Sequence, residues 1–191
     1  MSQTLPRPWT RDEFLTWERD RPERWEFDGF RPVAVGETGV SPGVGATAAH
    51  HRIARNGETA LRRRLTRCEV FRETMKLRLE HTHRYPDLMV VCSEVPGTAT
   101  EVSDPVAVFE VLSEGNAADD RITKNEEYRR TPSILYYVML EQSRAGAMVF
   151  TREGTDWVGR VVAGPDASLA LPEIGVEVPL AEFYEGVLDS P

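Results

Sequence analysis

The sequence predicts a single α/β domain over residues 1–191, with a mixed central β-sheet flanked by helices and preceded by an N-terminal helix and a β-hairpin. Three observations support this prediction. The length suits one compact domain and is short for two. The short apolar runs at 88–92, 106–112 and 134–140 are typical of central strands covered on both faces. A polar segment of helical length, residues 119–130, separates the last two runs.

The N-terminal helix has a clear start. Thr10 and Glu13 form a Thr-x-x-Glu capping box, in which each side chain accepts a hydrogen bond from the other residue's backbone N–H. Pro22 cannot continue a helix, so the helix should end at about residue 20. Asp28-Gly29 then lies between the apolar runs 25–27 and 30–35, which predicts a hairpin with a two-residue turn.

The other predicted elements follow from periodicity. Apolar and polar residues alternate over 71–79, which indicates one half-buried strand. A second helix is predicted over 46–65, although Asn56-Gly57 in its middle disfavours helix. A hairpin at 147–151 and 157–162 and a short helix at 179–184 complete the pattern.

Composition points to a cytoplasmic protein. Hydrophobic residues make up 40 % of the chain and charged residues 28 %, and no apolar stretch approaches membrane-span length. The first twenty residues contain no apolar core of signal-peptide length. Cys68 and Cys92 are far apart in sequence, so they are expected to be buried thiols rather than a disulfide or a zinc site. His81 and His83 have no further ligand at zinc spacing.

The net charge of −8 disfavours non-specific binding to a polyanion such as DNA. The charge is uneven, however. Residues 52–67 contain six arginines and one acid, Glu58. This segment could contact phosphate, although a solvated helix face is the preferred interpretation for the segment alone.

Glu110 is the most informative residue of the sequence. It lies inside the apolar run Val-Ala-Val-Phe-Glu-Val-Leu, residues 106–112. A carboxylate in a buried strand costs several kcal/mol unless it is paired or binds a cation. An edge strand with Glu110 facing water is the alternative. Asp87 begins the preceding strand, and two adjacent strands can place two carboxylates around one Mg²⁺.

Lys124 lies on the polar helix predicted over 119–130. Asp120, Lys124 and Tyr128 are spaced by four residues and therefore share one helix face. From the helix alone, an exposed Asp120–Lys124 pair worth a few tenths of a kcal/mol is the simpler interpretation. Glu26 lies between Trp25 and Phe27 in the hairpin, and His50 lies near the start of the second helix. A polar residue at the edge of the core is an alternative interpretation for both, and for His50 it is the default.

Several motifs in this order resemble the Uma-two family, a large bacterial group assigned as endonucleases within the P-D-(D/E)-x-K nuclease superfamily. The resemblance covers about residues 9–185. The motifs are Glu26 with Asp28-Gly29, Ser41-Pro42, His50, Pro86-Asp87, Phe109-Glu110-Val111-Leu112-Ser113, Asp120 with Lys124 and Tyr128, and Tyr136-Tyr137-Val138.

The resemblance implies a restriction-endonuclease-like core that cuts DNA with Mg²⁺, with Mn²⁺ expected as a substitute. Asp87 and Glu110 would bind the metal, helped by the Val111 carbonyl. Most of the superfamily has a lysine two residues after the second acid. Here that residue is Leu112, so the lysine's role would pass to Lys124, with Glu26 as an accessory acid.

Further site residues implied by the motifs are His50, Ser113, Asp120 and Tyr128. After Ser113 the chain reads Glu-Gly-Asn, where relatives often carry Pro-Ser-Thr, and this difference bears on substrate contacts. Nucleases of this kind often act as homodimers, and C₂ pairs are the commonest oligomers, so a homodimer is expected. The net charge motivates a rival hypothesis, a nuclease-fold binding or regulatory module without turnover.

Overall fold

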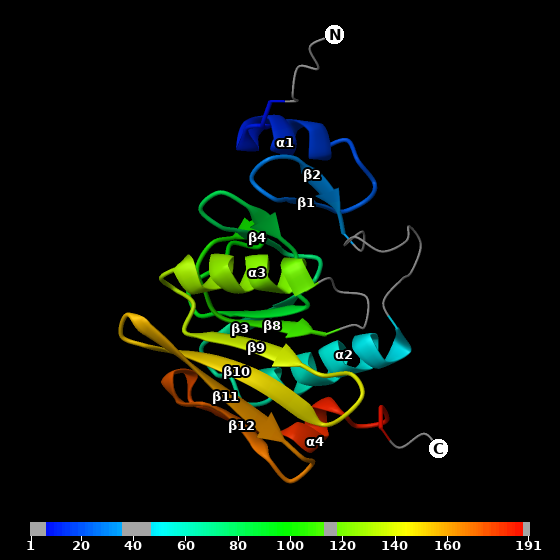
Figure 1. Cartoon of the computed structure of the whole chain (residues 1–191), viewed down its shortest axis with the longest axis vertical. Helices are drawn as coiled ribbons and strands as arrows, with labels where there is room; N and C mark the ends of the chain where they lie inside the picture. The colour runs from blue at the N-terminus through cyan, green and yellow to red at the C-terminus, as the bar shows by residue number, and fades with distance from the viewer. Residues whose placement is uncertain (1–6, 36–46, 113–117, 189–191) are drawn as a thin grey trace.

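A computed structural model describes residues 7–35, 47–112 and 118–188, without the side chains of 118–121 (Figure 1). The helices are α1 (Arg11–Glu18), α2 (Ala48–Arg62), α3 (Ala118–Arg130), the 3₁₀ turn η1 (Pro172–Ile174) and α4 (Leu180–Phe183). The strands are β1 (Trp25–Phe27), β2 (Pro32–Ala34), β3 (Glu69–Arg72), β4 (Lys76–Arg78), β5 (His83–Arg84), β6 (Leu88–Val91), β7 (Glu101–Val102), β8 (Pro105–Val111), β9 (Tyr136–Leu140), β10 (Gly146–Glu153), β11 (Asp156–Ala163), β12 (Ser168–Leu171) and β13 (Val176–Pro179).

The main sheet has six strands in the order β11-β10-β9-β8-β6-β3. Strands β8 and β9 are parallel and the other neighbours are antiparallel, which confirms the predicted mixed sheet. The apolar runs predicted to be central form β6, β8 and β9 at its middle. Two smaller sheets accompany it, with the orders β2-β1-β5-β4-β7 and β12-β13.

The two faces of the main sheet have separate cores, because side chains alternate along each strand. Leu88, Val90 and Phe109 pack with residues of α2, β12, β13 and α4. Met89 and Val108 belong to a second cluster that contains Tyr128 of α3 and Leu77 of β4. Figure 1 shows α3 on the viewer's side of the sheet, and the α3 face is the one that carries Glu110.

The N-terminal helix begins as predicted. Both hydrogen bonds of the Thr10–Glu13 capping box are present, although α1 ends at Glu18, slightly before the predicted end. The hairpin is also confirmed, but its turn differs from the prediction. Phe27 pairs with Pro32, so four residues connect the strands, and the Asp28 carboxylate accepts hydrogen bonds from the N–H groups of Phe30 and Arg31.

The single strand predicted over 71–79 was wrong. A turn closed by a 2.9 Å hydrogen bond from Met75 N to Arg72 O divides it into β3 and β4, which belong to different sheets. Alternation is the same in two consecutive strands, so the pattern could not reveal the break. This turn places the five-stranded sheet β2-β1-β5-β4-β7 next to the face of the main sheet that carries α3.

Cys68 and Cys92 form a disulfide, contrary to the prediction of separate buried thiols. They are 24 residues apart in sequence, but Glu69 of β3 pairs with Val91 of β6. The next residue pair along this antiparallel ladder is Cys68 and Cys92, so strand register brings the sulfurs together. Within the described ranges, no helix is both long and apolar enough to cross a membrane.

Gly57 explains how α2 tolerates the Asn-Gly pair. A Cβ at Gly57 would lie 2.8 Å from Phe183 Cε1 and 2.9 Å from Leu88 Cδ1, so only glycine lets α2 approach α4 and β6 this closely. Asn56 Nδ2 meanwhile donates hydrogen bonds to the carbonyls of Phe183 and Glu185. Asn56 and Gly57, which disfavour a helix, are therefore the residues that allow α2 to pack against α4 and β6.

We expect Gly57→Ala to lower the free energy of unfolding by about 1–3 kcal/mol, because the added methyl overpacks this contact. In an unconstrained helix the same change would instead stabilise by about 1 kcal/mol. Urea denaturation measures the difference, with the exposed neighbour Arg55→Ala as control. A Gly57→Ala variant as stable as the wild type would contradict the close approach.

His83 of β5 should make stability depend on pH. The side chain is fully buried, and burial, reinforced by the nearby Lys76 and Arg11 charges, lowers its pKa from 6.5 to about 4 despite Glu101 at 3.4 Å. Between these two values the unfolded chain binds more protons than the folded one, so stability is complete above pH 6.5 and falls as the pH is lowered towards 4.

The expected loss is on the order of 3 kcal/mol over this interval, measured as the urea midpoint at successive pH values. His83→Phe should remove much of that dependence. His81→Phe is the matched control, because the His81 side chain is 79 % exposed. Equal pH dependence in the wild type and His83→Phe would refute the assignment.

Candidate active site

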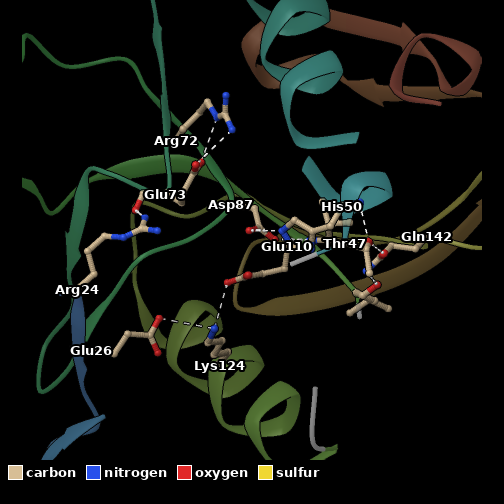
Figure 2. Close-up of polar contacts among 12 residues, drawn as sticks. Arg24, Glu26, Thr47, His50, Arg72, Glu73, Asp87, Glu110, Lys124 and Gln142 are labelled. Atoms are coloured by element: carbon tan, nitrogen blue, oxygen red, sulfur yellow. Dashed lines mark hydrogen bonds and ion pairs between the residues drawn. The ribbon is translucent and has the colours of Figure 1, made fainter. Parts of the chain in front are cut away.

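Strand register brings Asp87 and Glu110 together. In the antiparallel β6–β8 pair, Met89 pairs with Val108 and Leu88 with Phe109. One further step opposes Asp87 to Glu110, and by alternation both side chains lie on the α3 face of the sheet. Figure 2 shows the two carboxylates close to each other, where β6 begins and β8 ends.

Asp87 is held by two hydrogen bonds. Its Oδ2 accepts one from Val111 N at 2.7 Å, and its Oδ1 lies 2.8 Å from Nε2 of His50, in the first turn of α2. Burial disfavours the imidazolium, but the hydrogen bond to Asp87 and its charge outweigh this effect and raise the pKa of His50. The Val111 carbonyl points to the same side of β8 as its N–H, towards Asp87, because both groups of one residue share a side in an extended strand.

Glu110 is buried, with 8 % of its surface exposed, so the alternative of a solvent-facing edge residue was wrong. Its Oε1 accepts a 2.8 Å hydrogen bond from the Tyr128 hydroxyl and lies 3.8 Å from Lys124 Nζ. Burial raises the pKa of Glu110 to about 7, and the charges of Asp87 and Glu26 add to the effect of burial, while Lys124 opposes it.

Lys124 lies between two carboxylates. Its Nζ is 3.7 Å from Glu26 Oε1 and 3.8 Å from Glu110 Oε1. Figure 2 marks both ion pairs with dashed lines. The predicted position of the ammonium group, pointing from α3 into the site, is confirmed. Tyr128 lies one turn further on and reaches the same Glu110 oxygen, as expected for residues that share a helix face.

Glu26 is held by Arg84. Arg84 Nη1 donates to Glu26 Oε2 at 3.0 Å, and the backbone N–H of Tyr85 donates to Oε1 at 3.1 Å. Burial alone would raise the pKa of Glu26, but Lys124 and Arg84 outweigh it and hold the pKa below its ordinary value. Two buried carboxylates on either side of one lysine thus have pKa values shifted in opposite directions, which is typical of functional sites.

Arg84 and Glu127 were missed by the sequence analysis. Arg84 is 3 % exposed, and its Nε and Nη2 donate to the two carboxylate oxygens of Glu127 at 2.7 and 2.6 Å. This bidentate pair joins β5 to α3, the helix that carries Lys124. The only signal in the sequence is an arginine three residues before Asp87, and such a signal does not identify a partner 43 residues away.

Two of the predicted site residues cannot be placed. Ser113 lies outside the described residues, as does the Glu-Gly-Asn segment that follows it. Asp120 lies in α3, but its side chain is outside the described part. The structure brings the other predicted site residues into one connected cluster, which consists of Asp87, Glu110, Val111, Lys124, Tyr128, Glu26 and His50.

The donor set suits a hard cation such as Mg²⁺. In the part of the chain that is described, no group of three or more His, Cys, Asp and Glu residues has metal-binding geometry. Mg²⁺, however, is usually bound through one or two carboxylates together with water and substrate phosphate. Asp87, Glu110 and the Val111 carbonyl supply two carboxylates and one neutral oxygen, and a cation there would favour the ionised form of Glu110.

One solved structure has the same fold as this chain. The crystal structure of a protein described as a "putative nuclease belonging to DUF820", from Anabaena variabilis ATCC 29413, matches with a TM-score of 0.71 and 18 % identity, covering 95 % of this chain and all of that chain. At this identity the match shows the fold alone, a mixed α/β fold with helices flanking the sheet, as the sequence predicts.

The sequence of this chain matches a known protein family. A model of the Uma2 family, described as "Putative restriction endonuclease", matches residues 11–181, so the chain belongs to the Uma2 family and the suspected Uma-two resemblance is confirmed. Two relatives from Synechocystis sp. (strain ATCC 27184 / PCC 6803 / Kazusa) are described as uncharacterised. One is 25 % identical and covers 92 % of this chain and 91 % of its own length, and the other is 30 % identical and covers 70 % and 75 %.

Proposed function

We propose that this Uma2 protein is a metal-dependent DNA endonuclease whose site is formed by Asp87, Glu110 and Lys124. The observation that carries the proposal is the placement of two carboxylates from adjacent strands beside one buried lysine. The family description and the nuclease-like fold support hydrolysis of a phosphodiester bond. Mg²⁺ is the proposed cofactor, and Mn²⁺ is expected to replace it.

Each residue has a definable role in this proposal. Asp87, Glu110 and the Val111 carbonyl would hold the cation, which would supply activation of the attacking water and neutralisation of charge on the phosphate. The contact with His50 Nε2 and the hydrogen bond from the Val111 N–H hold the Asp87 carboxylate in place. Lys124 would orient the attacking water and stabilise the negative charge that develops on the phosphate oxygens.

Glu26 would act through Lys124. Its carboxylate is held by Arg84 and by the Tyr85 N–H, so it remains charged and keeps the ammonium group of Lys124 in place. Tyr128 holds one Glu110 oxygen through its hydroxyl. These contacts within the chain hold Glu26, Lys124 and Glu110 close together without any bound substrate.

Plasmid DNA tests the proposal. Nicking or linearisation with Mg²⁺ or Mn²⁺ should be abolished by chelator and by Glu110→Ala. The rival function, a silent nuclease-fold binding module, is favoured by the net charge of −8 and would leave the plasmid intact under all conditions. Cleavage unaffected by both chelator and Glu110→Ala would show that the assigned site is incorrect. The C₂ homodimer stays a prediction of the sequence, which light scattering can check.

A further inference from the structure

A hollow of about 440 Å³ is lined by residues from the end of α1, from the segment between α1 and β1, and by residues 74–76, 85, 99 and 100. Tyr85 helps to line it, and the backbone N–H of the same residue donates to Glu26. Arg24 also lines it and lies two residues before Glu26, next to which it appears in Figure 2. Tyr85 therefore connects the hollow to the candidate site, because Glu26 lies 3.7 Å from Lys124 Nζ.

The acid on the floor of this hollow is already neutralised. Glu18 forms a short ion pair with Lys76 and accepts a 3.0 Å hydrogen bond from the Tyr85 hydroxyl. The side chains of Glu18 and Lys76 are 11 % and 12 % exposed, so the pair forms a largely buried floor. The net charge seen by a ligand is therefore set by the remaining lining residues.

The charged residues among the remaining lining residues are predominantly basic. Arg19, Arg21 and Arg24 line the hollow and are exposed, against one further acid, Glu23. Over the ranges that the structure describes, none of the three arginines forms a salt bridge. The guanidinium carbon of Arg21 lies 4.5 Å from the centroid of the Trp17 ring. Three arginines against one glutamate leave a local excess of two positive charges on an acidic protein.

We propose that this arginine groove binds backbone phosphates of the nucleic-acid strand that is cut at the Asp87–Glu110 site. The proposal rests on the function proposed above and adds where the strand runs. Arginine suits phosphate because its planar guanidinium donates two parallel hydrogen bonds. Contacts of this kind fix the register of the strand without reading its sequence. Since Tyr85 both lines the groove and holds Glu26, a chain of phosphates can extend from one site to the other, whereas a single small phosphodiester reaches only one.

A matched pair of double variants tests the groove. Arg19→Ala with Arg21→Ala removes two positive charges from it, and Arg24 is kept because it also donates to the Glu73 carbonyl. Arg63→Ala with Arg67→Ala removes the same charge from an exposed region. Arg63 follows the last turn of α2, about 20 Å along the helix from His50.

The first measurement is the anisotropy of a fluorescent DNA oligonucleotide, titrated with the full chain in the presence of chelator at several salt concentrations. Arg19→Ala/Arg21→Ala should weaken binding by about tenfold and reduce the slope of log K against log salt by about two. Arg63→Ala/Arg67→Ala should change both values little. Equal effects of the two variants, or no binding by the wild type at low salt, would overturn the proposal.

The second measurement separates the groove from the chemistry. With bis(p-nitrophenyl) phosphate, a small substrate, Arg19→Ala/Arg21→Ala should cleave at the wild-type rate, while with DNA its KM should rise about tenfold at similar kcat. Cleavage of DNA with an unchanged KM would reject the groove and leave the nuclease function standing. If the two double variants differed in DNA affinity as predicted but neither they nor the wild type cleaved DNA, the groove would be supported and the nuclease function rejected.

Discussion

Replacing Glu110 by glutamine is expected to lower metal-dependent DNA cleavage by on the order of 10³-fold or more, the largest effect of any substitution considered. The amide keeps the size of the side chain and can still accept the Tyr128 hydrogen bond, but it removes one of the two anionic ligands of the proposed cation site. Single-turnover cleavage of a labelled duplex at saturating Mg²⁺ measures the loss.

The fold should survive this change. An ionised carboxylate at 8 % exposure carries a desolvation cost that the amide lacks, so thermal unfolding of Glu110→Gln should occur at or above the wild-type temperature. Glu126→Gln on α3 is the matched control, because the Glu126 side chain is 61 % exposed and should affect neither rate nor stability. Retained cleavage by a folded Glu110→Gln variant would place the chemistry elsewhere.

Replacing Lys124 by methionine is expected to reduce kcat by about 10²–10³-fold, since the variant keeps the aliphatic length and loses the ammonium group. Cation binding should not weaken, because Lys124 Nζ lies 3.8 Å from a Glu110 oxygen and repels a cation there. The combination of a lower kcat and an unchanged or stronger Mn²⁺ affinity distinguishes a catalytic lysine from a metal-site or packing role.

Arg130→Met on the same helix is the control for Lys124. Its side chain is 75 % exposed and pairs only with Glu126 among the described residues, so a loss of a few tenths of a kcal/mol in stability and no change in rate are expected. If Lys124→Met behaved like Arg130→Met, the assignment of the catalytic lysine to α3 would be wrong, and the non-catalytic rival would be favoured.

The central part of the fold could be predicted because its strands are continuous apolar runs. Residues covered on both faces leave a strong and local signal, and β6, β8 and β9 are found where the sequence indicates them. The turn at residues 73–75 left no such signal, because Leu77 continues the alternation begun at Phe71. Strands β12 and β13 were not predicted, and their pairing around η1 depends on packing against α2 and α4.

The candidate site could be predicted in part for a similar reason. A carboxylate inside an apolar strand is conspicuous, so Glu110 was found from the residues alone, and Lys124 was found from helix spacing together with the family resemblance. The Arg84–Glu127 pair and the contact between His50 and Asp87 depend on elements 43 and 37 residues apart in sequence. Such pairs leave no periodic pattern, because tertiary packing alone brings them together.

Binding of Mn²⁺ tests the central claim most directly, because it requires neither substrate nor turnover. Electron paramagnetic resonance of free Mn²⁺, titrated with the wild type, Glu110→Gln and Glu126→Gln, reports the affinity of each. We predict saturable binding by the wild type and by Glu126→Gln, and an affinity at least about tenfold weaker for Glu110→Gln. Equal affinities for the wild type and Glu110→Gln would contradict the assignment of Asp87 and Glu110 as a cation site.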